Sequence, residues 1–367
     1  MKEFKFFMPT QIVFGKDCIL NNADMFKTMG QKALIVTGKH SSKTNGSLTD
    51  VISALDKCGV GHVVFDQVEE NPTIETVLKI KELGLKEKID FVIGIGGGSA
   101  IDASKAASGF IKNTDKDTKE FLAGDIKTFL PMVAVPTTAG TGTEATKFTV
   151  ITMHELNTKV SPCRNAFPNI SFIDAKYTVN MPGTVTRNTA VDALTHLIEA
   201  YVHSQAYLLN DMIIENGLKL FKECISSLID NEYSYEVREK LLLASTLAGI
   251  AISNSGTSLP HALGYMPTYY KDVPHGRANS LFMSGYLRLF GEDEKVNKLL
   301  SLIGFSDIQE LQSFFDKLFK NDEKYTEDEI ESYTDEVMIK NKAKLSSFPR
   351  EITRDEMYNL FKTSLIK

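Results

Sequence analysis

Hydrophobic and polar positions follow two different rhythms along the chain, one in each half. In the first half, short apolar runs of strand length alternate with segments of helical periodicity. The runs Lys32–Thr37, Val63–Phe65, Phe91–Ile95 and Met132–Val135 predict strands, and continuous apolar runs are typical of strands that are buried on both faces. The repeated strand–helix alternation predicts a parallel sheet covered by helices.

The N-terminal segment Phe4–Phe14 has a different pattern. It mixes aromatic and β-branched residues around Pro9, which predicts extended edge strands. An unpaired edge exposes backbone N–H and C=O groups. We therefore expect a homodimer in which these strands pair across the interface, although the edge can equally pair within the chain.

The second half begins at about Tyr177, where strand-like runs give way to long segments with a 3.6-residue period. These segments are Thr189–His203, Asp211–Leu228 and Glu236–Ser253. A polar stretch that contains proline and glycine, residues 177–186, separates the two patterns. We therefore expect an α/β domain over residues 1–178 and an all-helical domain over residues 179–367.

Composition indicates a globular protein of two domains that does not bind nucleic acid or a membrane. With 367 residues, of which 43% are hydrophobic and 24% charged, the chain is long enough for two globular domains. The net charge of −6 argues against nucleic acid or an anionic membrane surface as a partner. Four cysteines without a CxxC pair indicate reduced thiols and a cytoplasmic protein. No apolar run approaches the length of a membrane span.

Two polar loops follow predicted strands. Gly96–Ser99 lies between a strand and a helix, but Ser99 stands where the dinucleotide fingerprint GxGxxG has its third glycine. Backbone amides and the helix dipole would attract a pyrophosphate there, and a tight turn without a ligand is the alternative. The second loop, residues 136–143, carries threonines and glycines. Loops at the carboxyl ends of parallel strands converge on one crevice.

A candidate metal site lies in the helical half. Asp192 and His196 are four residues apart and would share one face of a helix, and His261 and His275 follow in the segment 259–280. One carboxylate and three imidazoles suit Fe(II) or Zn(II). The alternative is that each histidine is an ordinary core or surface residue. The remaining histidines are expected at the surface, namely His40, His62, His154 and His203.

Taken together, these motifs resemble the iron-containing, group III alcohol dehydrogenases almost from end to end. The matching stretches are VTGK at Val36–Lys39, GGGS with the following Asp102, PTTAGTG at Pro136–Gly142, DALTH at Asp192–His196, and HALGY with PHG in His261–Gly276. The resemblance implies a Rossmann-like N-terminal domain and an all-helical metal-binding domain, the fold that this family shares with dehydroquinate synthase.

The resemblance also implies roles for individual residues. The metal ligands would be Asp192, His196, His261 and His275. Among the cofactor-binding positions, Gly97, Gly98 and Ser99 would cradle the pyrophosphate, with Asp102 in the helix that follows. Thr137, Thr138, Thr141 and Lys159 would line the nicotinamide–ribose half, and Asn71 would lie near the adenosine.

The activity implied is an NAD(P)-dependent, metal-dependent alcohol dehydrogenase. It would interconvert a small primary alcohol or diol and its aldehyde by hydride transfer, with the metal as Lewis acid. The alternatives are a zinc-dependent polyol dehydrogenase of the glycerol type, a dehydroquinate-synthase-like lyase, and a non-catalytic nucleotide-binding protein. The lyase requires a basic cluster for a substrate phosphate, whereas the segment 255–280 offers only Lys271 and Arg277.

Two positions depart from the common family pattern. Tyr265 stands where many members carry a second histidine, four residues after His261. Gly38 stands where NAD-preferring relatives carry an aspartate that repels a 2′-phosphate. Gly38 and the polar loop that follows it predict a preference for NADP over NAD, and a lysine-rich loop that only contacts solvent is the alternative. The loop residues concerned are Lys39, Ser41, Ser42 and Lys43.

Overall fold

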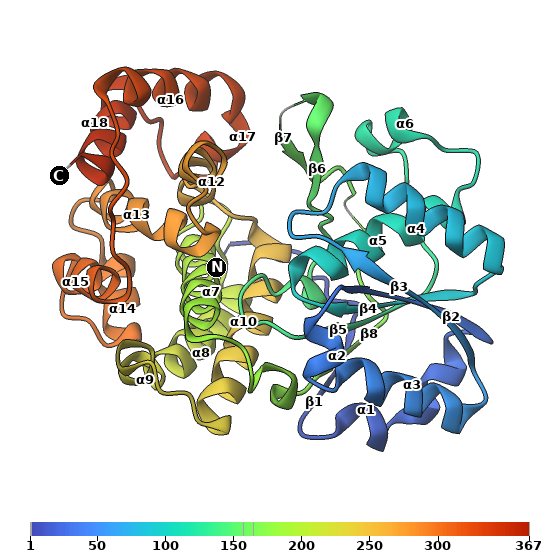
Figure 1. Cartoon of the computed structure of the whole chain (residues 1–367). Helices are drawn as coiled ribbons and strands as arrows, with labels where there is room; N and C mark the ends of the chain where they lie inside the picture. Colours follow the sequence, from blue (N-terminus) through green and yellow to red (C-terminus); the bar gives the residue numbers. More distant parts are fainter. Residues whose placement is uncertain (1, 157, 164, 367) are drawn as a thin grey trace. The chain divides into compact units, whose positions relative to one another are not determined.

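The chain folds into two compact units in the computed structural model, which describes residues 2–156, 158–163 and 165–366. One unit spans Met8–Met181, and the other combines Met1–Phe7 with Pro182–Lys367 (Figure 1). The polypeptide therefore passes from one unit to the other twice, once near residue 8 and once near residue 181.

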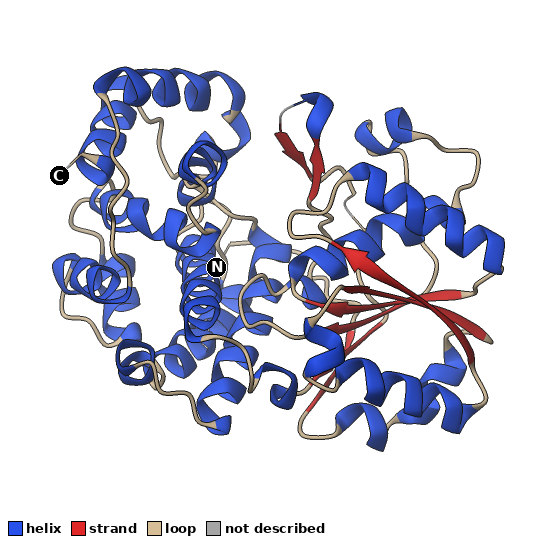
Figure 2. Cartoon of the chain, viewed as in Figure 1, coloured by secondary structure: helices blue, strands red, loops and turns tan. Residues whose placement is uncertain are grey.

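A six-stranded parallel sheet forms the centre of the first unit, in the order β1-β8-β5-β4-β2-β3. The helices pack on both faces of this sheet (Figure 2), so the predicted parallel, helix-covered sheet is confirmed. The strands are β1 (Gln11–Phe14), β2 (Lys32–Gly38), β3 (Gly61–Val68), β4 (Phe91–Gly96), β5 (Met132–Pro136) and β8 (Ile170–Ile173). The helices are α1 (Cys18–Asn21), η1 (Ala23–Thr28), α2 (Ser41–Thr44), α3 (Ser47–Cys58), α4 (Ile74–Glu87), α5 (Gly98–Lys112), α6 (Thr118–Leu122), η2 (Thr143–Ala145), η3 (His154–Leu156) and η4 (Ala175–Thr178).

The apolar runs become strands because both of their faces are buried. In β2, Leu34 and Val36 pack into the cluster that contains α4 and α5. Ala33 and Ile35 of the same strand pack into the opposite cluster, with α1, η1 and α3. A strand that is buried on both faces is apolar at successive positions and does not alternate between apolar and polar residues.

The order of the strands creates a switch point at β2. The chain runs from β2 to β3 on one side, and then crosses to β4 on the other side. The carboxyl ends of β2 and β4 are neighbours, and their loops lead to helices on opposite faces of the sheet. Ligands of open α/β sheets bind at such a switch point.

Some details differ from the sequence predictions. Only Gln11–Phe14 of the predicted N-terminal strand region is a strand, and it pairs within the chain with β8 at the sheet edge. A short antiparallel hairpin of β6 (Ile151–Met153) and β7 (Thr158–Val160) was not predicted, and neither was β8.

The second unit is helical, and no strand occurs in its described residues, so the predicted all-helical half is confirmed. Its central helix α7 (Gly183–Tyr201) packs against α8, α10 and α13, and it is buried almost throughout from Ala190 onward. The other helices are α8 (Leu208–Lys222), α9 (Ile225–Asp230), α10 (Tyr235–Ser255), α11 (Leu259–Leu263), α12 (Tyr265–Lys271), α13 (His275–Arg288), α14 (Glu294–Ile303), α15 (Ile308–Leu318), α16 (Glu327–Lys340), α17 (Lys342–Leu345) and α18 (Arg354–Leu365).

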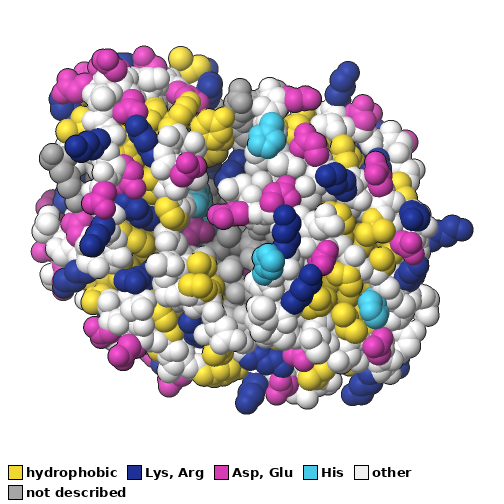
Figure 3. Space-filling model, in the orientation of Figure 1, with side chains coloured by type: hydrophobic (Ala, Val, Ile, Leu, Met, Phe, Trp, Pro, Cys, Tyr) yellow, Lys and Arg dark blue, Asp and Glu magenta, His cyan; other side chains and the backbone are white. Residues whose placement is uncertain are grey.

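The surface carries charges of both signs. Lysine and arginine side chains are interspersed with aspartate and glutamate over the face shown in Figure 3. Within the described part of the chain, no helix combines the length and the apolar character needed to cross a membrane.

Candidate metal centre and nucleotide loops

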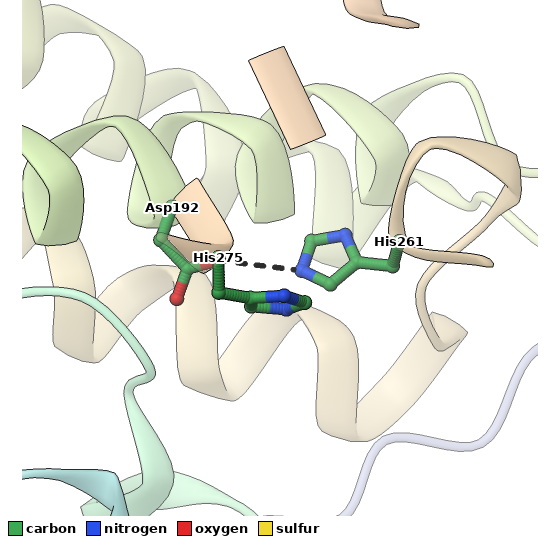
Figure 4. Close-up of side chains that lie close together, drawn as sticks. All are labelled: Asp192, His261 and His275. Carbon is green, nitrogen blue, oxygen red and sulfur yellow. Dashed lines mark ion pairs between the residues drawn. The ribbon is translucent and has the colours of Figure 1, made fainter. Parts of the chain in front are cut away.

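Three helices of the second unit bring a carboxylate and histidines together. Asp192 comes from α7, His261 from α11, and His275 is the first residue of α13 (Figure 4). One possible ligand atom from each of these residues lies within 4.8 Å of the other two. His261 Nε2 lies 3.5 Å from Asp192 Oδ1.

His196 also joins this cluster, although it is outside that group of three. It lies one turn after Asp192 on α7, and its ring stacks on the His261 ring with centroids 4.3 Å apart. The rings of His261 and His275 meet edge to face at 5.3 Å. The helix spacing and the three segments therefore gather all four predicted ligands around His261.

Two glycines make this gathering possible. A Cβ atom on Gly276 would lie 1.9 Å from the carbonyl oxygen of Asn188, so only glycine lets the start of α13 approach α7. A Cβ atom on Gly264 would lie 2.1 Å from Asn279 Oδ1. Asn279 in turn donates a hydrogen bond from Nδ2 to Asp192 Oδ1 at 3.3 Å. The glycines of the HALG and PHG motifs thus serve close helix packing.

The electrostatics of the cluster fit a bound cation. Burial would raise the pKa of Asp192, but the imidazoles of His196, His261 and His275 outweigh burial and hold it below its usual range. Burial would lower the pKa of His261, but the Glu199 and Asp192 carboxylates outweigh it and raise the pKa to about 9. Among the described residues, His261 Nε2 has no hydrogen-bond partner. Oxygen and nitrogen donors without a thiolate match Fe(II) or Zn(II).

Glu199 is a residue of this site that our sequence interpretation missed. It is fully buried on α7, and His261 Nδ1 lies 2.7 Å from its Oε1. The residue lies seven positions after Asp192 and three after His196, which places it on the same helix face. The spacing D-x-x-x-H-x-x-E was the available signal.

His203 also differs from expectation. It was expected at the surface, but it is only 9% exposed. The backbone N–H of Gln205 donates to its Nδ1 at 2.9 Å. Burial, and then the Lys344 ammonium, lower the pKa of His203 to about 4.

In the first unit, the two polar loops touch each other. A Cβ atom on Gly97 would lie 3.2 Å from the Thr138 side chain, and one on Gly98 would lie 2.8 Å from the Thr141 side chain. The N–H of Thr137 donates to the Gly96 carbonyl at 2.9 Å. The loops after β4 and β5 therefore form one surface at the start of α5, as predicted from their positions after parallel strands.

Three more of the predicted cofactor residues meet beside the glycine loop. The N–H of Asn71 donates to Ser99 Oγ at 3.2 Å, and Lys159 Nζ donates to Asn71 Oδ1 at 2.8 Å. Asn71 has a φ angle of 56°, a left-handed conformation that asparagine tolerates better than most residues. These contacts bring Lys159 of the β6–β7 hairpin to the start of α5 in the same unit.

Asp102, the remaining residue predicted near the glycine loop, has a buried carboxylate that is hydrogen-bonded within the unit. It is 7% exposed, and its carboxylate accepts hydrogen bonds from Thr143 Oγ1 at 2.5 Å and from the Val150 N–H at 3.0 Å. Both donors belong to the segment after β5. The structure therefore places Asp102 as an anchor of that segment inside the unit.

The loop after β2 is only partly available to a ligand. Ser42 is fully buried and accepts a hydrogen bond from Thr37 Oγ1 at 2.7 Å. Lys43 Nζ pairs with Asp66 Oδ2 at 2.5 Å, and the Lys43 ammonium holds the pKa of Asp66 below its usual range. Ser41 is exposed and Gly38 is half-buried.

Comparison with known proteins agrees with this layout. The family model of the iron-containing alcohol dehydrogenases matches residues 9–175, and the model for the C-terminal part of this family matches residues 186–365. The NADPH-dependent butanol dehydrogenase of Clostridium saccharobutylicum is 29% identical over 97% of each chain. The lactaldehyde reductase of Escherichia coli is 33% identical over 75% of this chain and 72% of the relative. A crystal structure of an iron-containing alcohol dehydrogenase from Thermotoga maritima matches 99% of both chains, with a TM-score of 0.91 and 32% identity.

Glycine- and threonine-rich loops after parallel strands and a cluster of oxygen and nitrogen donors are the features expected of a nucleotide- and metal-dependent oxidoreductase. The chain belongs to the iron-containing alcohol dehydrogenase family, because the family models cover almost its whole length. It is thus a metal-dependent alcohol dehydrogenase of the class that uses iron and NAD(P). The comparisons give no support to the zinc-dependent polyol dehydrogenase alternative.

Proposed function

We propose that the chain interconverts a small primary alcohol or diol and its aldehyde, with Fe(II) at the Asp192 cluster and with NADP(H) as the preferred cofactor. The observation that carries this proposal is the cluster that surrounds His261, in which the Asp192 carboxylate is buried and the His275 imidazole is exposed. Relatives named for butanol, for lactaldehyde and for 1,3-propanediol support a small substrate.

The four proposed ligands are Asp192, His196, His261 and His275. A divalent metal held there would polarise the oxygen of the alcohol or aldehyde. The chain's own contribution is to fix the donors: α7 spaces the first two, Gly276 lets His275 approach, and Asn279 orients the Asp192 carboxylate through its hydrogen bond. Zn(II) is the other metal that suits these donors.

The glycine loop would hold the nucleotide. Gly97 and Gly98 leave the backbone open at the start of α5, a 15-residue helix whose N-terminus has no side-chain cap. Free N–H groups at such a helix start attract a pyrophosphate. We assign the neighbouring hydroxyl, amide and ammonium groups to the ribose and nicotinamide contacts, namely Asn71, Ser99, Thr137, Thr138, Thr141 and Lys159.

The preference for NADP follows from the loop after β2. Gly38 presents no carboxylate that would repel a 2′-phosphate, and Lys39 and Ser41 are exposed beside it. Lys43 is held by Asp66, so a phosphate has to compete with that carboxylate. Each charge-assisted contact to a phosphate contributes about 1.5–3 kcal/mol, which is about tenfold to a hundredfold in affinity.

Cofactor choice is tested with two substitutions. The kcat/KM for NADPH and for NADH is measured for the wild type, Gly38→Asp and Asp66→Asn. A Cβ atom at Gly38 would have only an ordinary contact, 3.4 Å from the Val68 carbonyl oxygen, so the aspartate fits. We expect Gly38→Asp to erase the NADPH preference and Asp66→Asn to increase it by releasing Lys43. Equal or better use of NADH by the wild type contradicts the assignment.

The metal assignment is tested anaerobically with a panel of short aldehydes. Metal content and turnover are measured together for the wild type and for His275→Ala. The substitution removes an exposed ligand and should abolish most metal binding and nearly all turnover. Full activity of a verified metal-free preparation would overturn the proposal.

We further propose a homodimer that uses the N-terminal edge of the sheet. β1 is an edge strand, its last residue Phe14 is 41% exposed, and Phe7, four residues before the strand in the sequence, is 63% exposed. An edge strand with exposed aromatic neighbours is suited to pairing with a second copy. Light scattering at micromolar concentration should give the mass of a dimer, and a monomer would contradict this proposal.

A further inference from the structure

Glu199 is a buried carboxylate that the proposed ligand set does not use. It has no exposed surface, and burying a charge is costly unless it is paired and hydrogen-bonded. Its position on α7 puts it on the same helix face as Asp192 and His196. The groups that pair with this buried carboxylate therefore indicate its role.

Both oxygens of Glu199 are bound to the turn that carries His261. Oε1 accepts a hydrogen bond from the His261 backbone N–H at 3.1 Å and faces His261 Nδ1 at 2.7 Å. Oε2 accepts a hydrogen bond from the Ser258 N–H at 2.5 Å. The carboxylate therefore fixes the backbone and the ring of His261 at the same time.

The contact to Nδ1 determines which nitrogen of His261 remains for a metal. A carboxylate only accepts hydrogen bonds, so the proton of a neutral His261 ring must be on Nδ1. Nε2 then carries the lone pair, and this nitrogen lies 3.5 Å from Asp192 Oδ1. A histidine whose second nitrogen is held by a carboxylate is oriented and made more basic as a ligand.

We propose that Glu199 is a positioning residue that holds the Nδ1 proton of His261 and so directs Nε2 to the metal. The proposal rests on the metal site of the proposed function. A carboxylate that only capped the 258–261 turn would affect stability without affecting the affinity for metal, and this difference makes the two roles separable.

The test compares Glu199→Gln with a matched control, Glu215→Gln. Glutamine keeps the shape but has one acceptor oxygen, which cannot serve both Ser258 and His261. Glu215, on α8 of the same unit, accepts hydrogen bonds from Tyr201 and Lys298 and has no contact with His261 in the described structure. The full-length proteins are stripped of metal, and binding of Co(II) and Zn(II) is measured by competition with a chelator.

We expect Glu199→Gln to bind both metals about 10–100-fold more weakly than the wild type. Its Co(II) ligand-field bands should also shift, because the basicity and orientation of one nitrogen donor change. Glu215→Gln should keep the wild-type affinity and spectrum. Glu199→Asp, which keeps the charge but is one methylene shorter, should also bind more weakly, because position rather than charge is lost.

Each outcome decides between the two roles. Wild-type affinity and spectrum in Glu199→Gln, with only a lower melting temperature, would overturn the proposal. Failure of both Glu199 variants to fold while Glu215→Gln folds would also overturn it, since the role is then structural. A wild-type protein that binds no metal would instead refute the metal site of the proposed function.

Discussion

Gly276 shows how much a single residue controls in this fold. Its missing side chain allows α13 to start against α7, which brings His275 to Asp192. We predict that Gly276→Ala costs about 1–3 kcal/mol of stability by overpacking and lowers metal content. Urea unfolding and metal analysis measure the two effects. Gly61→Ala is the control, because its Cβ would have no contact closer than 3.6 Å. Normal metal content in Gly276→Ala would show that α13 can shift without loss of the site.

His203 predicts a specific sensitivity to acid. Its pKa is about 4 in the folded protein and about 6.5 when exposed. The unfolded chain therefore binds a proton before the folded chain does, so stability is present above pH 6.5 and is lost as the pH falls towards 4. The shift corresponds to about 3 kcal/mol at most.

This prediction is tested with His203→Gln. Unfolding midpoints in urea are compared at pH 7.5 and pH 4.5 for the wild type, this variant and His40→Gln, which replaces an exposed histidine. His203→Gln should lose less stability on acidification than the other two proteins. An identical loss in all three would mean that other groups dominate the acid response.

At the scale of elements, the threonine-rich loop after β5 is organised around Lys105 of α5. This fully buried ammonium donates hydrogen bonds to the carbonyl and hydroxyl oxygens of Thr143 and Thr146 and to the Phe148 carbonyl, at 2.6–3.1 Å. Burial lowers the pKa of Lys105 to about 8, and the Asp102 carboxylate opposes this shift. The side chain is therefore still protonated at neutral pH.

Removal of this ammonium should loosen the loop. Lys105→Met leaves three carbonyls and the Asp102 carboxylate without their buried cation, a loss of about 3–5 kcal/mol. We expect lower stability and at least tenfold weaker NADPH binding, measured by fluorescence, because Thr137, Thr138 and Thr141 lie on the same loop. Lys112→Met, at the exposed end of α5, is the control. Unchanged NADPH affinity in Lys105→Met would show that this loop does not contribute to binding the nucleotide.

The sequence predicted those elements whose pattern is local. Strands such as β2 and β4 are long continuous apolar runs, so their burial is visible in the sequence. β8 is a four-residue run, Ile170–Ile173, and its strand character depends on the neighbours β1 and β5. The segment before β1 looked like a strand because of its phenylalanines, but Phe4 stacks on Tyr207 and the Phe7 N–H donates to Asn254 instead.

The residues of the candidate site also fall into those that the sequence predicted and those that it did not. Spacing and family resemblance predicted Asp192 and the three histidines as one site, and the structure brings these residues together. Glu199 was missed because a glutamate on a helix is usually solvated, and its burial depends on a turn sixty residues away. The burial of Ser42 and the Lys43–Asp66 pair likewise depend on contacts that no local pattern reveals.

At the scale of the whole molecule, the N-terminal segment belongs to the helical unit. Phe4 stacks on Tyr207 with ring centroids 4.6 Å apart. Lys2 donates to the Ser204 carbonyl at 2.7 Å, and the Phe7 N–H donates to Asn254 Oδ1 at 3.1 Å. An aromatic pair contributes about 0.5–1.5 kcal/mol beyond its buried area.

Deletion of residues 2–7 should therefore affect the helical unit selectively. We expect faster hydrogen exchange in residues 202–210 and 250–256, with unchanged exchange in β2 and β4. The matched comparison is the point variant Phe4→Ala, which should show a smaller effect in the same segments. Equal acceleration in both units would contradict the assignment of this segment to the helical unit alone.

The two passages of the chain between the units have a consequence for synthesis on the ribosome. Residues 2–7 emerge before the rest of this sequence, but their partners Ser204, Tyr207 and Asn254 emerge only after the whole α/β unit has been made. The α/β unit is contiguous and can fold while the chain is still growing. Until these partners have been made, the phenylalanines of residues 2–7 have nothing in the helical unit to pack against. Chaperones can therefore bind this apolar segment in nascent chains shorter than about 250 residues.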